Sequence, residues 1–320
     1  MGMADFRFSF NVLDIGSREQ FIEICRRGEA YGYDTVFAAD HLGFAAPFPA
    51  LVAAAAATER LKVGTLVLNA AFWNPALLAR EVVTTDVLTG GRLELGLGSG
   101  HMKWEFDEAG IPWESFGPRA DRLESTIQEL GRLFASEGYP QQAATREALG
   151  LPRFGPVQRQ GFGGSGPPLI VGGTGDRILR IAAEHADIIA IAGAYQIKGR
   201  PPGTFRLGTA EEAAERVRYA RERAGDRAGQ VEWHVLAQLV METDDREAAA
   251  EGLLERYGHT MTAEEILDTP FLLIGTVEQM AEQMLRNRER FGFTYYTVHG
   301  PFMDAFAPVI ERVRARTKPS

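Results

Sequence analysis

Three of the six histidines are predicted to lie where a buried strand ends, the place where α/β proteins collect their reactive groups. His41, His101 and His299 each follow a short apolar segment. A metal centre is not predicted, because residues 5–14, which include the first predicted strand, contain no histidine to complete a ligand set. A serine nucleophile is disfavoured as well, because residues 96–100 read Gly-Leu-Gly-Ser-Gly rather than G-x-S-x-G. These histidines can instead supply an imidazole that titrates near neutral pH.

A glycine-rich turn, Gly172-Gly173-Thr174-Gly175, stands between a predicted strand and a predicted helix. Glycines let backbone N–H groups approach an anion closely, and the positive end of the helix dipole points to the same place. Arg177 and Arg180 lie in that helix and add positive charge. The pattern fits a phosphate site and a plain turn with a helix cap equally well, so both interpretations stay open. No G-x-G-x-x-G or Walker pattern is present, which argues against a Rossmann or P-loop nucleotide site.

The elements that must position these groups alternate between strands and helices along the chain. The predicted strands cover residues 6–12, 35–39, 61–68, 93–97, 169–171, 187–192, 231–241 and 294–298. Each parallel pairing needs a helical crossover, so eight such units favour a closed (β/α)₈ barrel over an open doubly wound sheet. Residues 137–167 are rich in Gly, Pro and Gln and are predicted to form an inserted loop before the fifth strand, either at the rim of the pocket or as a mobile lid. We therefore predict one α/β barrel domain over residues 1–320.

The composition excludes several classes of protein. With 34 Lys and Arg against 43 Asp and Glu, the chain carries a net charge of −9, which disfavours a nucleic-acid binder. The Ala-rich segment 50–57 is too short to span a bilayer, and no secretion signal is evident, so we expect a cytoplasmic protein without membrane contact. A single cysteine, Cys25, cannot form an intramolecular disulfide.

Several short segments, taken in order, make the chain resemble the bacterial luciferase-like superfamily. Its members are (β/α)₈ barrels that use FMN or the deazaflavin coenzyme F420, and the overall pattern is most similar to the F420-dependent branch. The resemblance covers nearly the whole chain and is carried by Asp40-His41, Val63-Gly64-Thr65, Asn74-Pro75-Ala76, Leu88 to Arg92 leading into Leu95 to Gly100, Pro168 to Gly173, and Ile274 to Glu278.

The resemblance implies that Asp40 and His41 lie beside the cofactor ring and the substrate. His41 would then act as a proton donor or acceptor, or it would only hold the ring by a hydrogen bond. His101 stands where some F420 enzymes of the family carry a glutamate, and it could serve as the acid or base instead. This departure puts a sugar-phosphate dehydrogenase activity in doubt. Four side chains could line the substrate pocket or merely pack, namely Phe48, Trp73, Trp104 and His299.

The resemblance also implies a set of cofactor contacts. A non-prolyl cis peptide bond is expected between Leu66 and Val67, where it would support the ring. Ser99 and Gly100 are expected near the ring or its ribityl chain. The phosphate would lie on Gly172, Gly173 and Thr174, with Arg177 adding positive charge.

The expected function is an oxidoreductase that transfers a hydride between F420 and a small organic substrate. The alternative is an FMN-dependent monooxygenase that uses O₂ and receives reduced flavin from a separate reductase. A non-catalytic flavin-binding relative is a third possibility. F420 carries an acidic tail, so a local concentration of positive charge is expected between Gly172 and Arg206. A homodimer is expected because dimers are common in the family.

Overall fold

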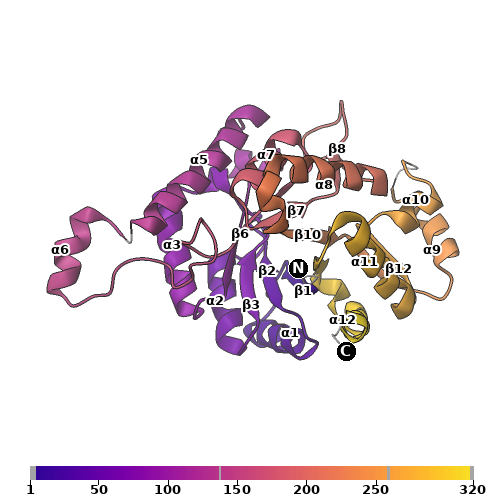
Figure 1. The fold of residues 1–320 in the computed structure, drawn as a ribbon, viewed down its shortest axis with the longest axis horizontal. Coiled ribbons are helices and arrows are strands. Elements are labelled where there is room, and N and C mark those ends of the chain that lie inside the picture. Colours follow the sequence, from indigo (N-terminus) through magenta and orange to yellow (C-terminus); the bar gives the residue numbers. More distant parts are fainter. Residues whose placement is uncertain (1–4, 137, 258–259, 318–320) are drawn as a thin grey trace.

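The computed structural model describes residues 5–136, 138–257 and 260–317, and their strands close into one barrel (Figure 1). All strand pairings around the barrel are parallel, and pairing of the third barrel strand with the fourth closes the ring. The predicted (β/α)₈ barrel is therefore confirmed. Its eight strand positions are occupied by β1 (Arg7–Val12), β2 (Thr35–Ala38), β3 (Lys62–Thr65), β5 (Leu93–Gly98), β6 (Leu169–Gly173), β7 (Ile188–Ile191), β10 (Glu232–Ala237) and β13 (Tyr295–His299).

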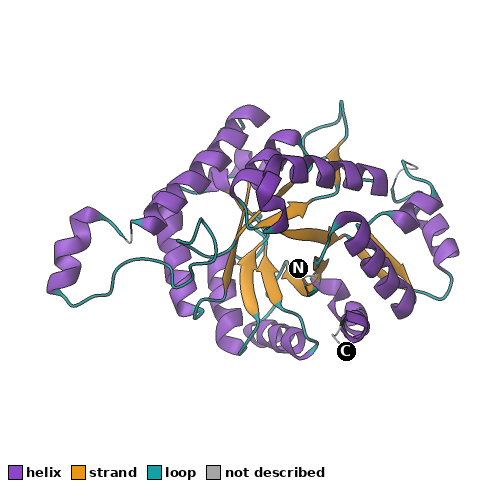
Figure 2. Cartoon of the chain, in the orientation of Figure 1, coloured by secondary structure: helices purple, strands orange, loops and turns teal. Residues whose placement is uncertain are grey.

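Helices surround this sheet, as Figure 2 shows, and local caps fix where several of them begin. Ser17 and Gln20 form a capping box at the first helix, and Asn74 caps the third helix, whose first residue is Pro75. The helices are α1 (Arg18–Ala30), α2 (Pro47–Ala57), α3 (Pro75–Leu88), α4 (Lys103–Glu108), α5 (Phe116–Ala135), α6 (Pro140–Ala148), α7 (Asp176–His185), α8 (Ala210–Ala224), α9 (Arg246–Leu253), α10 (Ala263–Asp268), α11 (Val277–Phe291) and α12 (Met303–Thr317). None of the helices within the described ranges combines the length and the apolar character needed to cross a lipid bilayer.

Two predicted strands are divided in the structure, and three further strands were not predicted. The third strand is split into β3 and β4 (Leu68–Asn69), and the seventh into β10 and β11 (Leu239–Glu242). β11 leaves the barrel to pair with β12 (Leu272–Gly275), a strand that was not predicted. The antiparallel hairpin of β8 (Ala194–Gln196) and β9 (Phe205–Leu207) was also missed, because its strands are short and largely polar.

The insertion is not the plain loop that was predicted. It contains α6, because Pro140 suits the first turn of a helix and the residues after it are good helix formers. Figure 1 shows α6 projecting beyond α3 and α5. The return segment lies at the amino-terminal end of the barrel, where Gln158 Nε2 donates to Asp86 Oδ1 (2.7 Å) and to the carbonyl of Leu93 (2.6 Å). This segment is therefore remote from the strand ends that carry the histidines, and it does not form the rim of their pocket.

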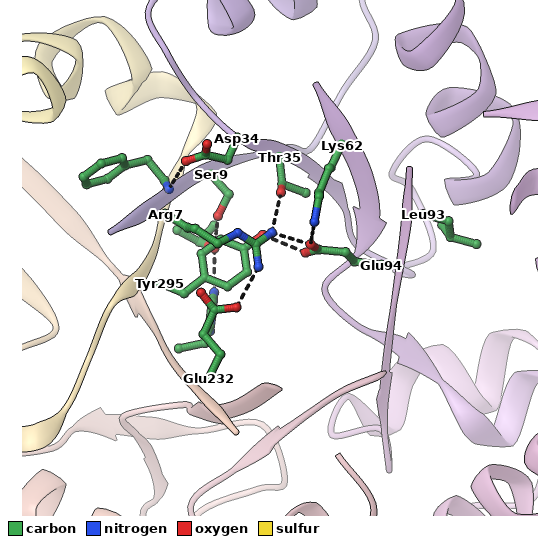
Figure 3. A network of polar contacts seen from close by, with 12 residues as sticks. Arg7, Ser9, Asp34, Thr35, Lys62, Leu93, Glu94, Glu232 and Tyr295 are labelled. Atoms are coloured by element: carbon green, nitrogen blue, oxygen red, sulfur yellow. Dashed lines mark hydrogen bonds and ion pairs between the residues drawn. The ribbon is translucent and has the colours of Figure 1, made fainter. Parts of the chain in front are cut away.

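A charged network fills the amino-terminal end of the barrel (Figure 3). Arg7 lies between Glu94 and Glu232, pairing with Glu94 and reaching Glu232 Oε2 at 2.6 Å. Glu94 is almost completely buried, and it also receives Tyr295 Oη (2.8 Å) and Lys62 Nζ (3.3 Å). This end of the barrel is thus sealed by paired charges, as expected for the stability face of a barrel rather than its reactive face.

The interior above this network holds one further histidine. His234 is fully buried, its Nε2 lies 2.6 Å from Thr297 Oγ1, and its ring meets Tyr295 edge to face. Burial lowers the pKa of His234 to about 3, so this imidazole is neutral at pH 7. Another histidine, His259, lies outside the described residues.

Candidate active site

The carboxyl-terminal ends of β2, β4 and β5 bring the predicted site residues together. His41 and Asp40 follow β2, and His101 follows β5 by way of Ser99-Gly100. The rings of His41 and His101 meet edge to face with their centroids 5.4 Å apart. Two histidines separated by 60 positions in the chain thus share one site, as the strand-end argument predicts.

His41 is held from one side by Glu105, a buried residue of α4. His41 Nδ1 lies 2.8 Å from Glu105 Oε1, and the same oxygen accepts the backbone N–H of Leu42 at 3.1 Å. An ionised carboxylate can only accept hydrogen bonds, so this contact places the proton of the neutral imidazole on Nδ1. Nε2 has no hydrogen-bond partner among the described residues and is free for a substrate or cofactor.

His101 lies against two aromatic neighbours, with the ring of Phe205 on β9 at 5.5 Å between centroids and His41 on another side. The pKa of His101 is lowered because these neighbours partly remove the ring from water and because His41 opposes a second positive charge. Because Phe205 belongs to β9, its contact with His101 brings the hairpin β8–β9 over the site. Gly203, near its tip, also comes close to Met102 and to the carbonyl of His101.

Asp40 is bound within the wall of the site. Its Oδ2 accepts Trp73 Nε1 at 2.9 Å and the backbone N–H of Asn69 at 3.2 Å. Burial raises the pKa of Asp40, although these two donors oppose the rise. Trp73 in turn packs edge to face on Phe48, which is buried in the hydrophobic core. Phe48 therefore supports Trp73 from behind, and the contacts of Asp40 are those of a positioning group.

Ser99 and Gly100 are fixed by a buried arginine on α5. Arg119 donates to the carbonyls of both residues and stacks over the ring of Trp113. Gly100 has a φ of +73°, and a Cβ atom there would lie 2.6 Å from the amide atoms of Asn69, so only glycine fits. Asn69 Nδ2 is buried without a hydrogen-bond partner among the described residues. An unpaired buried donor beside Gly100 can donate to an acceptor atom of a ligand or to a water molecule.

The peptide bond between Leu66 and Val67, where β3 gives way to β4, is cis. The position predicted for this bond is thereby confirmed.

The predicted anion turn follows β6 on the neighbouring side of the barrel mouth. Gly175 begins α7 without a side-chain cap, and Thr174 Oγ1 donates to the carbonyl of Ala194 on β8. Arg216 of α8, absent from our predictions, lies beside the turn and reaches the Thr174 carbonyl (3.2 Å) and Asp176 Oδ1 (2.5 Å). Helix α7 therefore offers uncapped backbone N–H groups next to a cation that neutralises its first acidic residue.

Most of the basic side chains expected to supply positive charge around this turn form ion pairs with carboxylates. Arg177 binds Asp121, Arg180 binds Glu124 and Glu184, and Arg206 binds Glu212. Within the described part of the stretch from Gly172 to Arg206, the cations that pair with no carboxylate are Lys198 and Arg200, near the tip of the β8–β9 hairpin. The helix surface around Arg177 is thus close to electrically neutral.

The remaining pocket candidates lie on different sides of the mouth. Trp104 on α4 has 52% of its surface exposed and is free for contact. His299, at the end of β13, lies between Asn11 (Nδ1 to Nδ2, 3.1 Å) and Gln238 (Nε2 to Oε1, 3.2 Å), and burial lowers its pKa. Both ring nitrogens of His299 are therefore taken up by side chains, unlike those of His41.

Sequence reasoning missed four groups of this site, namely Glu105, Asn69, Arg119 and Arg216. Each acts on a residue distant in the chain, and Glu105 is 64 positions from His41. A signal was available for Glu105, since it is the first acidic residue after His101 in the sequence. Nothing local distinguishes Arg119 from the other arginines of α5.

The chain is similar to known proteins along most of its length. The family model described as luciferase-like monooxygenase matches residues 7–270. An F420-dependent glucose-6-phosphate dehydrogenase of Kribbella flavida is 25% identical over 317 residues, 90% of this chain and 91% of the relative. One of Amycolatopsis mediterranei is 35% identical over 135 residues, which span 38% of this chain and only 40% of that relative.

The fold is shared with solved structures of low sequence identity. An F420-dependent secondary alcohol dehydrogenase, in complex with an F420–acetone adduct, superimposes with a TM-score of 0.70 at 17% identity. That alignment covers 97% of this chain and all of the other. With the family model matching most of its length, the chain belongs to the luciferase-like monooxygenase family.

Proposed function

We propose that this protein is an F420-dependent oxidoreductase that transfers a hydride between the deazaflavin and a small organic substrate. The observation that carries the proposal is His41, whose Nδ1 is held by Glu105 while Nε2 is left unpaired at the barrel mouth. The similarity to an F420-dependent glucose-6-phosphate dehydrogenase over 90% of the chain favours F420 as the hydride carrier. The substrate itself is not assigned. Because position 101 is a histidine, we do not propose that this protein shares the sugar-phosphate substrate of the relatives.

The residues fit such a cofactor on two observations. Asn69 Nδ2 is an unpaired buried donor beside Ser99-Gly100, suited to a carbonyl or hydroxyl of the ring or its ribityl chain. The Gly172–Gly175 turn ends in an uncapped helix, suited to a phosphate. When bound, the deazaflavin supplies a ring carbon that accepts or releases a hydride.

The protein's own contribution is to orient the substrate and to handle one proton. When a substrate hydroxyl is oxidised, neutral His41 accepts its proton at Nε2, and the reverse reaction returns the proton from the same atom. The carboxylate of Glu105 stabilises the imidazolium that forms. His101, neutral because its pKa is lowered, is placed to hold the substrate oxygen or to act as a second acid or base. Asp40 positions Trp73 and the backbone of Asn69 around the ring site.

The second candidate function is an FMN-dependent monooxygenase that uses O₂ and draws reduced flavin from a separate reductase. It is favoured by the family's description and by the paired arginines around the phosphate turn. These pairs leave little free positive charge for the acidic tail of F420 beyond Lys198 and Arg200. The shared barrel and glycine turn fit both cofactors.

Binding of the two cofactors separates these functions. We expect quenching of F420 fluorescence on titration with the purified protein and binding at least tenfold weaker for FMN. The Lys198→Ala, Arg200→Ala double variant should weaken F420 binding, because the charged tail loses its free cations, while leaving FMN binding unchanged. Tight FMN binding without any F420 response would exclude the first function and support the second.

We also propose that the protein is a cytoplasmic homodimer. The dimer is supported by the projecting helix α6, which buries none of its residues against its own chain and is followed by the exposed side chains of Leu149 and Leu151. Light scattering after size exclusion should give twice the mass of one chain. The Leu149→Glu, Leu151→Glu double variant should shift the protein to a monomer at the same concentration, because two charges would be buried without partners. An unchanged dimer in that variant would place the interface elsewhere.

A further inference from the structure

We propose that Glu105 is a positioning residue that fixes the orientation and the tautomer of His41, so that Nε2 rather than Nδ1 faces the reacting atoms. The inference deepens the proposed function and rests on the role of His41 stated there. Glu105 lies in the first turn of α4, and only 2% of its surface is exposed. It would therefore act through His41 without touching substrate or cofactor.

The geometry is that of an oriented imidazole. Oε1 of Glu105 accepts two hydrogen bonds from neighbouring positions, Nδ1 of His41 at 2.8 Å and the backbone N–H of Leu42 at 3.1 Å. The second bond anchors the backbone next to the histidine, so the ring and its supporting segment are fixed by one carboxylate oxygen. Phe44 packs edge to face on the ring at 5.5 Å between centroids and limits its rotation.

The other charged groups near His41 are bound elsewhere, so Glu105 is its partner. On α4, Lys103 binds Asp107 at 2.6 Å and therefore does not compete for Glu105. Asp40 is committed to Trp73 and to the Asn69 backbone, and Arg119 is committed to two loop carbonyls. His101 is the other titratable group against the ring, and it contacts His41 edge to face without a hydrogen bond. Among the described residues, Glu105 is thus the one group that hydrogen-bonds this imidazole.

A buried carboxylate in this place has two chemical consequences. It fixes the neutral ring as the Nδ1–H tautomer, which leaves the lone pair of Nε2 free to accept a proton. It also opposes the charge of the imidazolium that forms when Nε2 takes up that proton. An amide in place of the carboxylate can keep the first effect and loses the second, whereas alanine loses both.

Nitrogen NMR of the cofactor-free protein tests the inference without using activity. In ¹⁵N-labelled wild-type protein, with His41 assigned from the His41→Asn spectrum, the neutral ring should be the Nδ1–H tautomer. Glu105→Ala should abolish that preference, and Glu105→Gln should retain it in part. Glu108→Gln, an exposed neighbour on the same helix, should leave the His41 signals unchanged. A wild-type ring in the Nε2–H form, or unchanged His41 signals in Glu105→Ala, would overturn the inference.

Kinetics then separate positioning from mere folding support. Glu105→Gln should lower kcat for hydride transfer about 10- to 100-fold, the usual effect of losing a partner behind a functional group, with KM and cofactor affinity within about twofold. A fall in unfolding temperature with kcat unchanged would overturn the positioning role. Should Glu105→Ala fail to fold, the wild-type tautomer and Glu105→Gln decide the question. If the protein shows no F420 turnover at all, the proposed function fails. The NMR experiment still tests the contact between Glu105 and His41, because it does not depend on activity.

Discussion

Replacement of His41 by alanine is expected to slow hydride transfer to or from F420 by about 10²- to 10⁴-fold, the usual contribution of a positioned acid or base. The reason is that Nε2 of His41 lies unpaired at the barrel mouth, with its Nδ1 held 2.8 Å from a buried carboxylate. Cofactor affinity should change by less than about threefold, because the phosphate turn and Asn69 belong to other elements. Pre-steady-state measurement of F420 absorbance separates the hydride step from binding.

Two further variants sharpen this experiment. His185→Ala removes a histidine at the outer end of α7, and its hydride transfer should match that of the wild-type protein. His41→Gln keeps a polar side chain that cannot carry a proton at neutral pH, so it should be almost as slow as His41→Ala. If His41→Ala transfers hydride at the wild-type rate, His41 is not the proton-transfer group. His101, whose ring contacts His41, would then be the next residue to test.

The barrel and the position of the site could be predicted from the sequence because they depend on local patterns. Apolar strands that end in Asp40-His41 or Ser99-Gly100-His101 specify which residues gather at the mouth of a parallel barrel. The prediction failed where pairing partners decide the structure. β11 and β12 are a pair outside the barrel, and neither strand alone shows that it leaves the ring.

The finer features of the site depend on contacts between distant segments, which a single sequence does not reveal. The arginine pattern predicted free positive charge at the phosphate turn, whereas Arg177 is neutralised by Asp121 on another helix. Glu105 and Arg119 were missed for the same reason, since their roles come from the loops they hold across the site. The residue types at strand ends were therefore predictable, and the groups that orient them were not.

The second large effect is expected at the opposite end of the barrel, where Glu94→Gln should lower the free energy of unfolding by about 3 kcal/mol. Arg7, partly buried, loses the charge of its fully buried partner, and Lys62 and the hydroxyl of Tyr295 lose their acceptor charge as well. The loss should lie at the lower end of the usual range for a broken buried pair, because Glu232 still pairs with Arg7. Urea-induced unfolding followed by circular dichroism measures it.

The pH dependence of unfolding gives this prediction a second test. Burial by itself would raise the pKa of Glu94, but Arg7, Lys62 and Tyr295 outweigh burial and hold that pKa below its ordinary value. The stabilisation by ionised Glu94 is therefore present above the pKa of the unfolded state and is lost as the pH falls through the lower pKa of the folded state. Wild-type protein should lose this contribution to the free energy of unfolding in acid, whereas Glu94→Gln, which lacks it, should not. Burial instead raises the pKa of Glu232, so its ionisation costs stability and Glu232→Gln should destabilise less. Equal losses in the two variants at neutral pH would contradict the assignment of Glu94 as the centre of the network.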